Sequence, residues 1–214
     1  DKDGGSPGAA AAGDDPRPEG APSYQHLPGV KAISQQCKEC HAEIYAIWEK
    51  SQHALANRVA VFPQDAGMFA GQTLETKVEK WHFLKKGEQP RIVNNDKEYA
   101  VDMAIGESPL VQYLVPVEGG RWQTTSAAWA PEDNEWFDML SGDDRTAADW
   151  GHWTGRGMTW NVQCAYCHMT DFKKNYDAKT DTYHSSWTEM GVGCTQCHGE
   201  IMESPDAATG CLID

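Results

Sequence analysis

The sequence predicts a mainly α-helical and irregular fold with a small antiparallel β insertion in the middle. Three observations predict it. Apolar residues recur at helical spacing between residues 32 and 58. Paired turn signals divide the middle of the chain into short alternating segments, and the part after residue 149 is aromatic with little periodicity. Helices should therefore lie towards both ends and strands between them.

Residues 1–30 are expected to form a flexible tether. The stretch is rich in Gly, Ala, Pro and Asp and has almost no apolar side chain larger than Ala. Such a composition cannot bury enough apolar surface to offset the conformational entropy that ordering removes. Two interpretations are open: a link to a lipidated N-terminal anchor, or the mature end of a soluble protein.

A helix is expected from residue 32 to about residue 58. Ser34 is a candidate N-cap, because a serine hydroxyl can accept a hydrogen bond from the first helical turn. Apolar side chains then recur three or four residues apart (Ile44, Ile47, Trp48 and Leu55). His41 and His53 also lie on this stretch. If the helix is continuous, about 18 Å separates them along its axis.

Residues 61–148 are expected to contain a small antiparallel sheet. Lys85-Lys86-Gly87 and Glu118-Gly119-Gly120 read as hairpin turns, and residues 111–117 and 121–129 flank the second of them. Tyr99, Val101, Met103 and Ile105 alternate with smaller or polar residues, as in a half-buried strand. This region shows no catalytic pattern. After residue 149 we expect short helices following cysteine motifs, joined by loops.

The pattern Cys-x-x-Cys-His occurs three times, at residues 37–41, 164–168 and 194–198. It attaches c-type haem, because two thiols at this spacing can add to the vinyl groups on one haem edge while the His ligates the iron. A zinc ribbon needs two Cys-x-x-Cys pairs about 15–20 residues apart and does not explain the His. Structural disulfides are the other alternative. The expected attachment residues are Cys37, Cys40, Cys164, Cys167, Cys194 and Cys197, with His41, His168 and His198 as iron ligands.

A trihaem c-type cytochrome is therefore predicted, with a fold organised by its haems. Its expected regions are the tether (1–30), a first haem module (31–60), the β-rich insertion (61–148), and the second and third haem modules (149–214). The seventh cysteine, Cys211, is left without a motif partner. It is either a free thiol or the partner of a cysteine in a second chain.

The remaining histidines are candidates for the opposite face of each iron. His53, His152 and His184 are the main candidates, and His26, His82 and Met158 are weaker ones. On a continuous helix His41 and His53 cannot face each other across one ring. His53 should therefore ligate a different haem from the one that His41 holds, which would join the first module to the C-terminal one.

Four segments of the chain resemble a known domain. They are residues 37–53, 152–156, 160–168 and 175–199. Together they resemble the multihaem cytochrome c domain of large exported cytochromes with tetratricopeptide repeats, which is related to tetrahaem cytochromes of ammonia oxidisers and to pentahaem nitrite reductase. The resemblance implies bis-His haems in close-packed pairs, electron transfer, and distal-ligand roles for His53 and His152. After Gly199 the sequence departs from the relatives, which continue with Gly-Pro-Gly-Ser and a nearby His. That departure leaves the distal ligand of the third haem open.

The expected function is one-electron transfer between redox partners outside the cytoplasmic membrane, because haem c is attached there. The chain would be periplasmic or extracellular, as a shuttle, a subunit of a membrane redox complex, or a filament unit that binds copies of itself. A net charge of −14 argues against nucleic acid and favours a basic redox partner. No apolar run is long enough to span a membrane, so only an N-terminal anchor would attach the chain to one.

An enzyme is the main alternative function. It would reduce a small nitrogen or sulfur compound at an open third haem, with His184 or Arg156 as proton donor or anion binder. A redox or gas sensor is a third interpretation.

Overall fold

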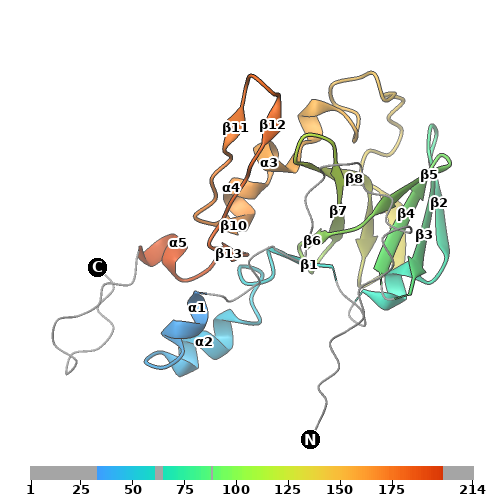
Figure 1. Cartoon of the computed structure of the whole chain (residues 1–214). Helices are drawn as coiled ribbons and strands as arrows, with labels where there is room; N and C mark the ends of the chain where they lie inside the picture. Colours follow the sequence, from blue (N-terminus) through green and yellow to red (C-terminus); the bar gives the residue numbers. More distant parts are fainter. Residues whose placement is uncertain (1–32, 61–64, 88, 200–214) are drawn as a thin grey trace, which may run out of the picture.

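The computed structural model describes residues 33–60, 65–87 and 89–199, and most of its regular structure is antiparallel β-sheet (Figure 1). Strands hold 36% of the described residues and helices 19%. The expectation of a mainly α-helical fold with a small β insertion is therefore wrong, because the sheets form the main body. The expected tether, His26 and Cys211 lie outside the described residues.

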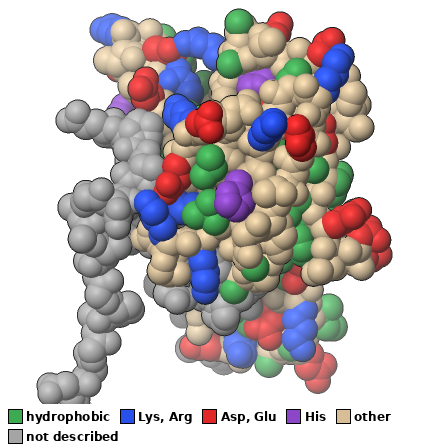
Figure 2. All heavy atoms as spheres, turned by 90° about the vertical axis from the view of Figure 1, so that its right-hand side faces the viewer, with side chains coloured by type: hydrophobic (Ala, Val, Ile, Leu, Met, Phe, Trp, Pro, Cys, Tyr) green, Lys and Arg blue, Asp and Glu red, His purple; other side chains and the backbone are tan. Residues whose placement is uncertain are grey.

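One sheet has four antiparallel strands in the order β2-β3-β4-β5. Its strands are β2 (Gln72–Glu75), β3 (Lys80–Lys86), β4 (Gln89–Asn94) and β5 (Lys97–Ala100). The predicted turn after Lys86 is confirmed, since β3 ends there and Gly87 has a φ of +58°. Figure 2 shows the side of the molecule on which this sheet lies, where acidic and basic side chains are interspersed.

The second sheet has five strands in the order β1-β6-β7-β8-β9. Its strands are β1 (Asn57–Val59), β6 (Met103–Ile105), β7 (Val111–Val117), β8 (Arg121–Ala130) and β9 (Glu135–Asp138). The predicted β7–β8 hairpin is confirmed, because two glycines at its tip adopt the positive φ that such a turn requires. The predicted strand through Tyr99 and Ile105 is instead two strands in different sheets, and both residues are buried.

The main core is aromatic and joins the two sheets. Phe83 of β3 and Trp136 of β9 stack with ring centroids 3.5 Å apart and an interplanar angle of 2°. Further buried rings surround this pair (Phe69, Trp81, Tyr113, Trp129 and Trp153). Burying one large apolar side chain stabilises a fold by about 1.5–3 kcal/mol, so this cluster is a large part of what holds the sheets together.

The helices are short, and several coincide with the cysteine motifs. They are α1 (Ser34–Cys37), α2 (Ala42–Trp48), α3 (Trp160–Gln163), α4 (Ala165–His168) and α5 (Thr195–His198), with single 3-10 turns η2 (Ala66–Phe69) and η3 (Arg156–Met158). The continuous helix expected up to residue 58 is wrong. His41 has φ −121° and ψ 45°, which ends the helical path between α1 and α2. None of the helices in the described ranges could cross a membrane by its length and apolar character.

Two small two-stranded sheets complete the C-terminal part, where only loops and helices were expected. Strand β10 (Met169–Thr170) pairs with β13 (Glu189–Met190), and β11 (Tyr176–Asp177) pairs with β12 (Thr182–Tyr183). The β11–β12 hairpin contacts the tip of the β7–β8 hairpin, where the Tyr183 amide donates to the Gly119 carbonyl at 2.8 Å. Arg121 also donates to Asp181 at 2.6 Å. These contacts join the C-terminal segment to the two main sheets, which together are called the β body below.

Candidate haem-binding sites

All three cysteine motifs form the same backbone turn. In each, the amides of the second Cys and of the His both donate to the carbonyl of the first Cys, at 2.9–3.3 Å. In a helical turn the residues at positions i, i+3 and i+4 lie on one face. Each turn therefore presents two thiols and one imidazole on the same side, which is the geometry that a covalently attached haem requires.

None of the six motif cysteines forms a disulfide within the described residues. In each motif the second cysteine is exposed, while Cys37 of the first motif is buried. Burial raises the pKa of the Cys164 thiol, whereas the reactive thiolates of redox dithiols have lowered pKa values. Within residues 33–60, 65–87 and 89–199, no three His, Cys, Asp or Glu side chains gather at a common metal position.

His41 carries a nitrogen that fits an iron ligand. Its Nε2 is buried and has no hydrogen-bond partner in the described part of the chain. A buried polar atom without a partner costs free energy, and the great majority of such atoms are satisfied by something. A haem iron would satisfy this one.

His168 shows the complementary arrangement. Its Nδ1 lies 2.7 Å from the carbonyl oxygen of Ala56. Metal-ligating histidines usually donate their second ring N–H to a carbonyl or carboxylate, which fixes the tautomer and leaves the other nitrogen for the metal. The residues of the second motif thus fit a haem as well, and the carbonyl that orients His168 comes from Ala56, in the segment that follows the first motif.

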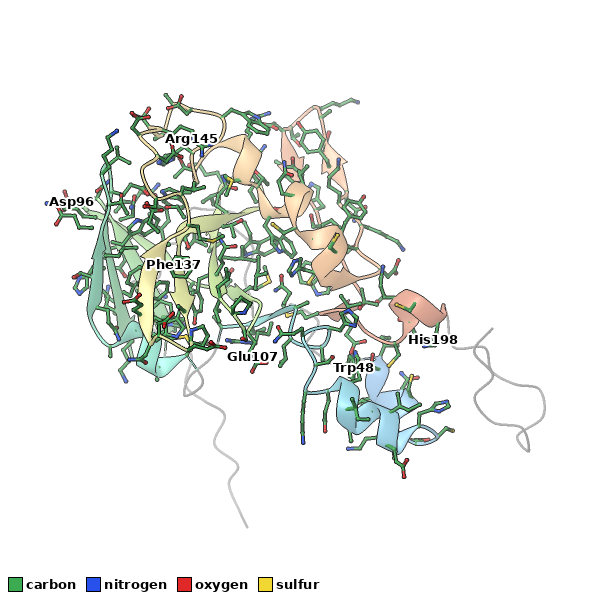
Figure 3. The ribbon with its side chains drawn as sticks, turned by 180° about the vertical axis from the view of Figure 1, so that it is seen from behind. Trp48, Asp96, Glu107, Phe137, Arg145 and His198 are labelled. Atoms are coloured by element: carbon green, nitrogen blue, oxygen red, sulfur yellow. The ribbon has the colours of Figure 1, made fainter. Side chains whose placement is uncertain are left out.

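The first and third motif segments are also fastened together. The Trp48 indole donates to the Val192 carbonyl at 3.0 Å, and the Val192 amide donates to the His53 carbonyl at 2.8 Å. Figure 3 shows Trp48 on α2 near α5, which carries the exposed His198, at the end of the molecule away from the sheets. These hydrogen bonds hold the first and third motif segments in contact. The role of His53 as an axial ligand stays a prediction, and its side chain is exposed.

One cavity of about 580 Å³ borders all three motif segments. Gln36 precedes the first motif, Tyr166 lies within the second, and Gln196 lies within the third. Its volume falls in the range of about 300–1,000 Å³ that is common for small-molecule and cofactor pockets. The fold thus brings together three segments that are far apart in the sequence.

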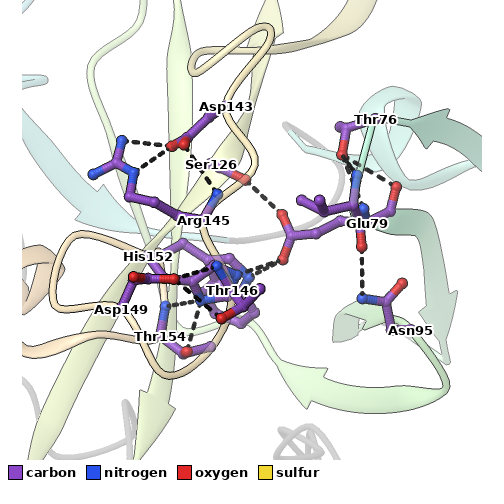
Figure 4. A network of polar contacts seen from close by, with 12 residues as sticks. Thr76, Glu79, Asn95, Ser126, Asp143, Arg145, Thr146, Asp149, His152 and Thr154 are labelled. Atoms are coloured by element: carbon purple, nitrogen blue, oxygen red, sulfur yellow. Dashed lines mark hydrogen bonds and ion pairs between the residues drawn. The ribbon is translucent and has the colours of Figure 1, made fainter.

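His152 lies in a different environment, within a polar network around Glu79 (Figure 4). Its Nδ1 is 2.8 Å from the Thr154 hydroxyl and its Nε2 is 3.2 Å from Glu79. Glu79 is buried and also accepts hydrogen bonds from Trp153 and Ser126. None of these partners belongs to a cysteine motif. An axial-ligand role for His152, which stays a prediction, would require its contact with Glu79 to break.

The other candidate ligands are more peripheral. His184 is exposed just after β12, with its Nε2 3.2 Å from the Thr182 hydroxyl. His82 is exposed on β3. Arg156 forms an ion pair with Asp181.

The sequence did not single out Glu79 or Glu189, two buried carboxylates near the candidate sites. Both lie in stretches of mixed polar and apolar residues in the sequence, so no local pattern marks either one as buried.

The chain matches the model of a known protein family. Residues 36–80 and 121–199 match the model of a family described as cytochrome c554 and c-prime. These ranges contain all three motifs, and the unmatched residues hold most of β3 and all of β4, β5, β6 and β7. No curated protein matches the chain.

The chain is also similar to a solved structure, the undecaheme cytochrome from the S-layer of Carboxydothermus ferrireducens. The sequence identity is 18% and the TM-score is 0.47, and the match covers 83% of this chain and 21% of that one. The chain therefore spans about a fifth of the length of that protein.

Proposed function

Because the chain belongs to the cytochrome c554 and c-prime family, we propose that it is a trihaem cytochrome that passes single electrons between redox partners outside the cytoplasmic membrane. Family membership makes it an electron-transfer cytochrome with covalently bound haem c. The number of haems, the ligands and the location are the proposed part.

The observation that carries the number three is the repeated turn. Three segments place two thiols and an imidazole on one face through the same pair of backbone hydrogen bonds. We propose one haem for each turn, with a first haem module at residues 31–60 and two more at residues 149–214, separated by the β-rich region at residues 61–148.

Each residue of a motif has a separate role in this proposal. The cysteines form thioethers with the haem, and the motif histidines ligate iron. The haem supplies the one-electron redox chemistry. The carbonyl of Ala56 holds the His168 ring in one orientation and keeps the proton on Nδ1, which makes the other nitrogen a better donor to the metal. The proposed distal ligands are His53, His152 and His184.

The partners follow from charge and chemistry. A net charge of −14 favours a redox partner with a basic surface, which long-range electrostatic attraction would steer into contact. Haem c is attached outside the cytoplasmic membrane, so a periplasmic or extracellular location is proposed. The chain would act there as a shuttle, as a subunit of a membrane redox complex, or as a unit that associates with copies of itself. An N-terminal anchor is the proposed direct attachment to the membrane.

The test is a haem count on the holoprotein and on variants that lack one cysteine pair. Intact mass and a pyridine haemochrome assay should give three haems, and each pair changed to Ser (Cys37 with Cys40, Cys164 with Cys167, Cys194 with Cys197) should remove one. Cys211→Ser is the matched control, because that cysteine is outside the motifs, and it should leave the count unchanged. A wild-type count below three would contradict the proposal.

Electron paramagnetic resonance of the oxidised protein tests the role in electron transfer. Low-spin signals alone are expected if every iron has two strong axial ligands. A high-spin iron whose signal shifts on addition of nitrite, sulfite or cyanide would favour an enzyme that reduces a small nitrogen or sulfur compound.

A further inference from the structure

A buried carboxylate lies where the first and third motif segments meet. Glu189 of β13 has no exposed surface. Its Oε2 accepts hydrogen bonds from the Ser34 amide at 3.1 Å and from the Ser34 hydroxyl at 2.9 Å. Ser34 begins α1, which ends at Cys37, so the carboxylate is one hydrogen bond from the turn that carries the first attachment site.

The same serine also reaches the third attachment site. Its hydroxyl oxygen accepts a hydrogen bond from the amide of Cys194 at 2.9 Å. The space here is tightly filled. A Cβ added at Gly193 would lie 2.5 Å from Glu189 Oε2 and 2.8 Å from the Ser34 hydroxyl. Glu189 is therefore placed between two haem-attachment turns by contacts that leave no room for another side chain.

Within residues 33–60, 65–87 and 89–199, the titratable side chains near this junction come mainly from α2 and the residues that flank it. Tyr45 approaches from α2, and burial raises the pKa of its phenol, with Glu49, Glu189 and Cys194 adding to the rise. Strand β10 contributes Thr170, which does not titrate. The thiols of Cys37 and Cys194 are consumed when haem is attached. Among the described residues, the acid–base groups of the chain near the junction are then Glu189 and Tyr45, with Glu49 and Lys38 next to Tyr45; the Lys38 Nζ lies 5.2 Å from the centre of the Tyr45 ring.

Electrostatics couples such a group to nearby irons. Reduction adds one negative charge to an iron, and in the low effective dielectric of the interior this charge repels a buried carboxylate more strongly than it would in water. Protonation of the carboxylate removes the repulsion. The coupling is reciprocal: if reduction of the iron strengthens proton binding by some free energy, binding of the proton favours reduction by the same free energy.

We propose that Glu189 takes up a proton when the haem of the first or the third motif is reduced, so that this chain couples electron transfer to proton transfer. The inference rests on the proposed haem attachment. An electron from the redox partner reduces one ferric iron to ferrous, and one proton from solvent adds to the Glu189 carboxylate. On oxidation the electron leaves to the acceptor and the proton returns to solvent.

The experiment is a potentiometric titration of the holoprotein at a series of pH values. In the wild type at least one haem potential should fall as pH rises, by up to the about 59 mV per tenfold change in proton concentration that full one-electron, one-proton coupling produces. Glu189→Gln keeps the size and the acceptor oxygen but cannot ionise. It should abolish this slope and raise that potential at high pH.

Asp171→Asn is the matched control. It also removes one carboxylate charge from the C-terminal segment, but the Asp171 side chain is 53% exposed, so solvent screens it and the slope should remain. If Glu189→Gln retains the wild-type slope, the proposal is wrong.

A second readout needs no variant. The infrared difference spectrum of the reduced minus the oxidised wild type should show a protonated carboxyl band. Potentials that do not depend on pH, together with no such band, would overturn the proposal even if Glu189→Gln failed to fold. A protein with three haems and these results would still be the proposed cytochrome, whereas a haem count below three would instead contradict the function.

Discussion

The ion pair between Arg58 and Asp65 offers a sharp test of what stabilises the β body. Two parallel hydrogen bonds of 2.8 Å join the guanidinium of Arg58 to the carboxylate of Asp65. The Tyr113 hydroxyl donates to the same carboxylate, also at 2.8 Å. The side chains of Arg58 and Asp65 are only 6% and 0% exposed. Asp65→Asn would keep the shape of this site and remove its negative charge.

The expected loss is large because a cation would remain buried without its counter-ion. Breaking a buried pair by changing one partner costs about 3–5 kcal/mol in the free energy of unfolding. The exposed pair of Lys77 and Asp144, with side chains 59% and 74% exposed, gives the matched control. Asp144→Asn should cost no more than about 1 kcal/mol, since solvent screens such pairs.

Urea unfolding of the holoprotein, followed by far-ultraviolet circular dichroism, measures both variants. The double substitution Arg58→Met with Asp65→Leu should recover most of the stability, because no unpaired charge is left in the interior. An Asp65→Asn protein within about 1 kcal/mol of wild type would refute this reasoning about the charge. So would a double variant no more stable than the single one.

Two further predictions concern Tyr113 and Gly120. Burial, followed by the nearby charge of Asp65, raises the pKa of Tyr113 in the folded protein. The stability that this phenol contributes is therefore fully present below the unfolded tyrosine pKa of about 10, and it falls as pH rises above that value. Tyr113→Phe should reduce the fall in the free energy of unfolding at alkaline pH, as measured by urea unfolding. An unchanged fall would show that Tyr113 does not cause it. Gly120→Ala should loosen the β11–β12 hairpin, because φ is +70° and the new Cβ would lie 2.1 Å from the Tyr183 carbonyl. Hydrogen exchange should rise in residues 176–183, whereas Gly142→Ala, with φ +86° and open space, should cost only about 1–2 kcal/mol of backbone strain.

Local chemistry made part of the fold predictable. The two adjacent glycines of the β7–β8 turn can adopt a positive φ at little cost, so the hairpin and most of its strand bounds follow from the sequence. The three cysteine motifs are likewise local, and their turns need contacts only between neighbouring residues.

The size of the β body was harder to predict for physical reasons. Strand β8 is buried on both faces over almost its whole length, so it lacks the alternation that identifies a half-exposed strand. Strands β2 and β9 have four residues each, too few to show a period. The helical spacing after Ser34 fails to continue because tertiary contacts decide the path of the chain there, including the hydrogen bond from Ser34 to Glu189.

The contacts that hold the motif segments together join residues that are far apart in the chain. Ser34 and Glu189 are separated by 155 positions, and Ala56 and His168 by 112. Contacts of such long sequence separation require the closure of long loops, which costs conformational entropy before the contacts offset it. The three motif turns can therefore form locally, whereas the junction that buries Cys37 forms only when residues 34–41 and 189–198 come together.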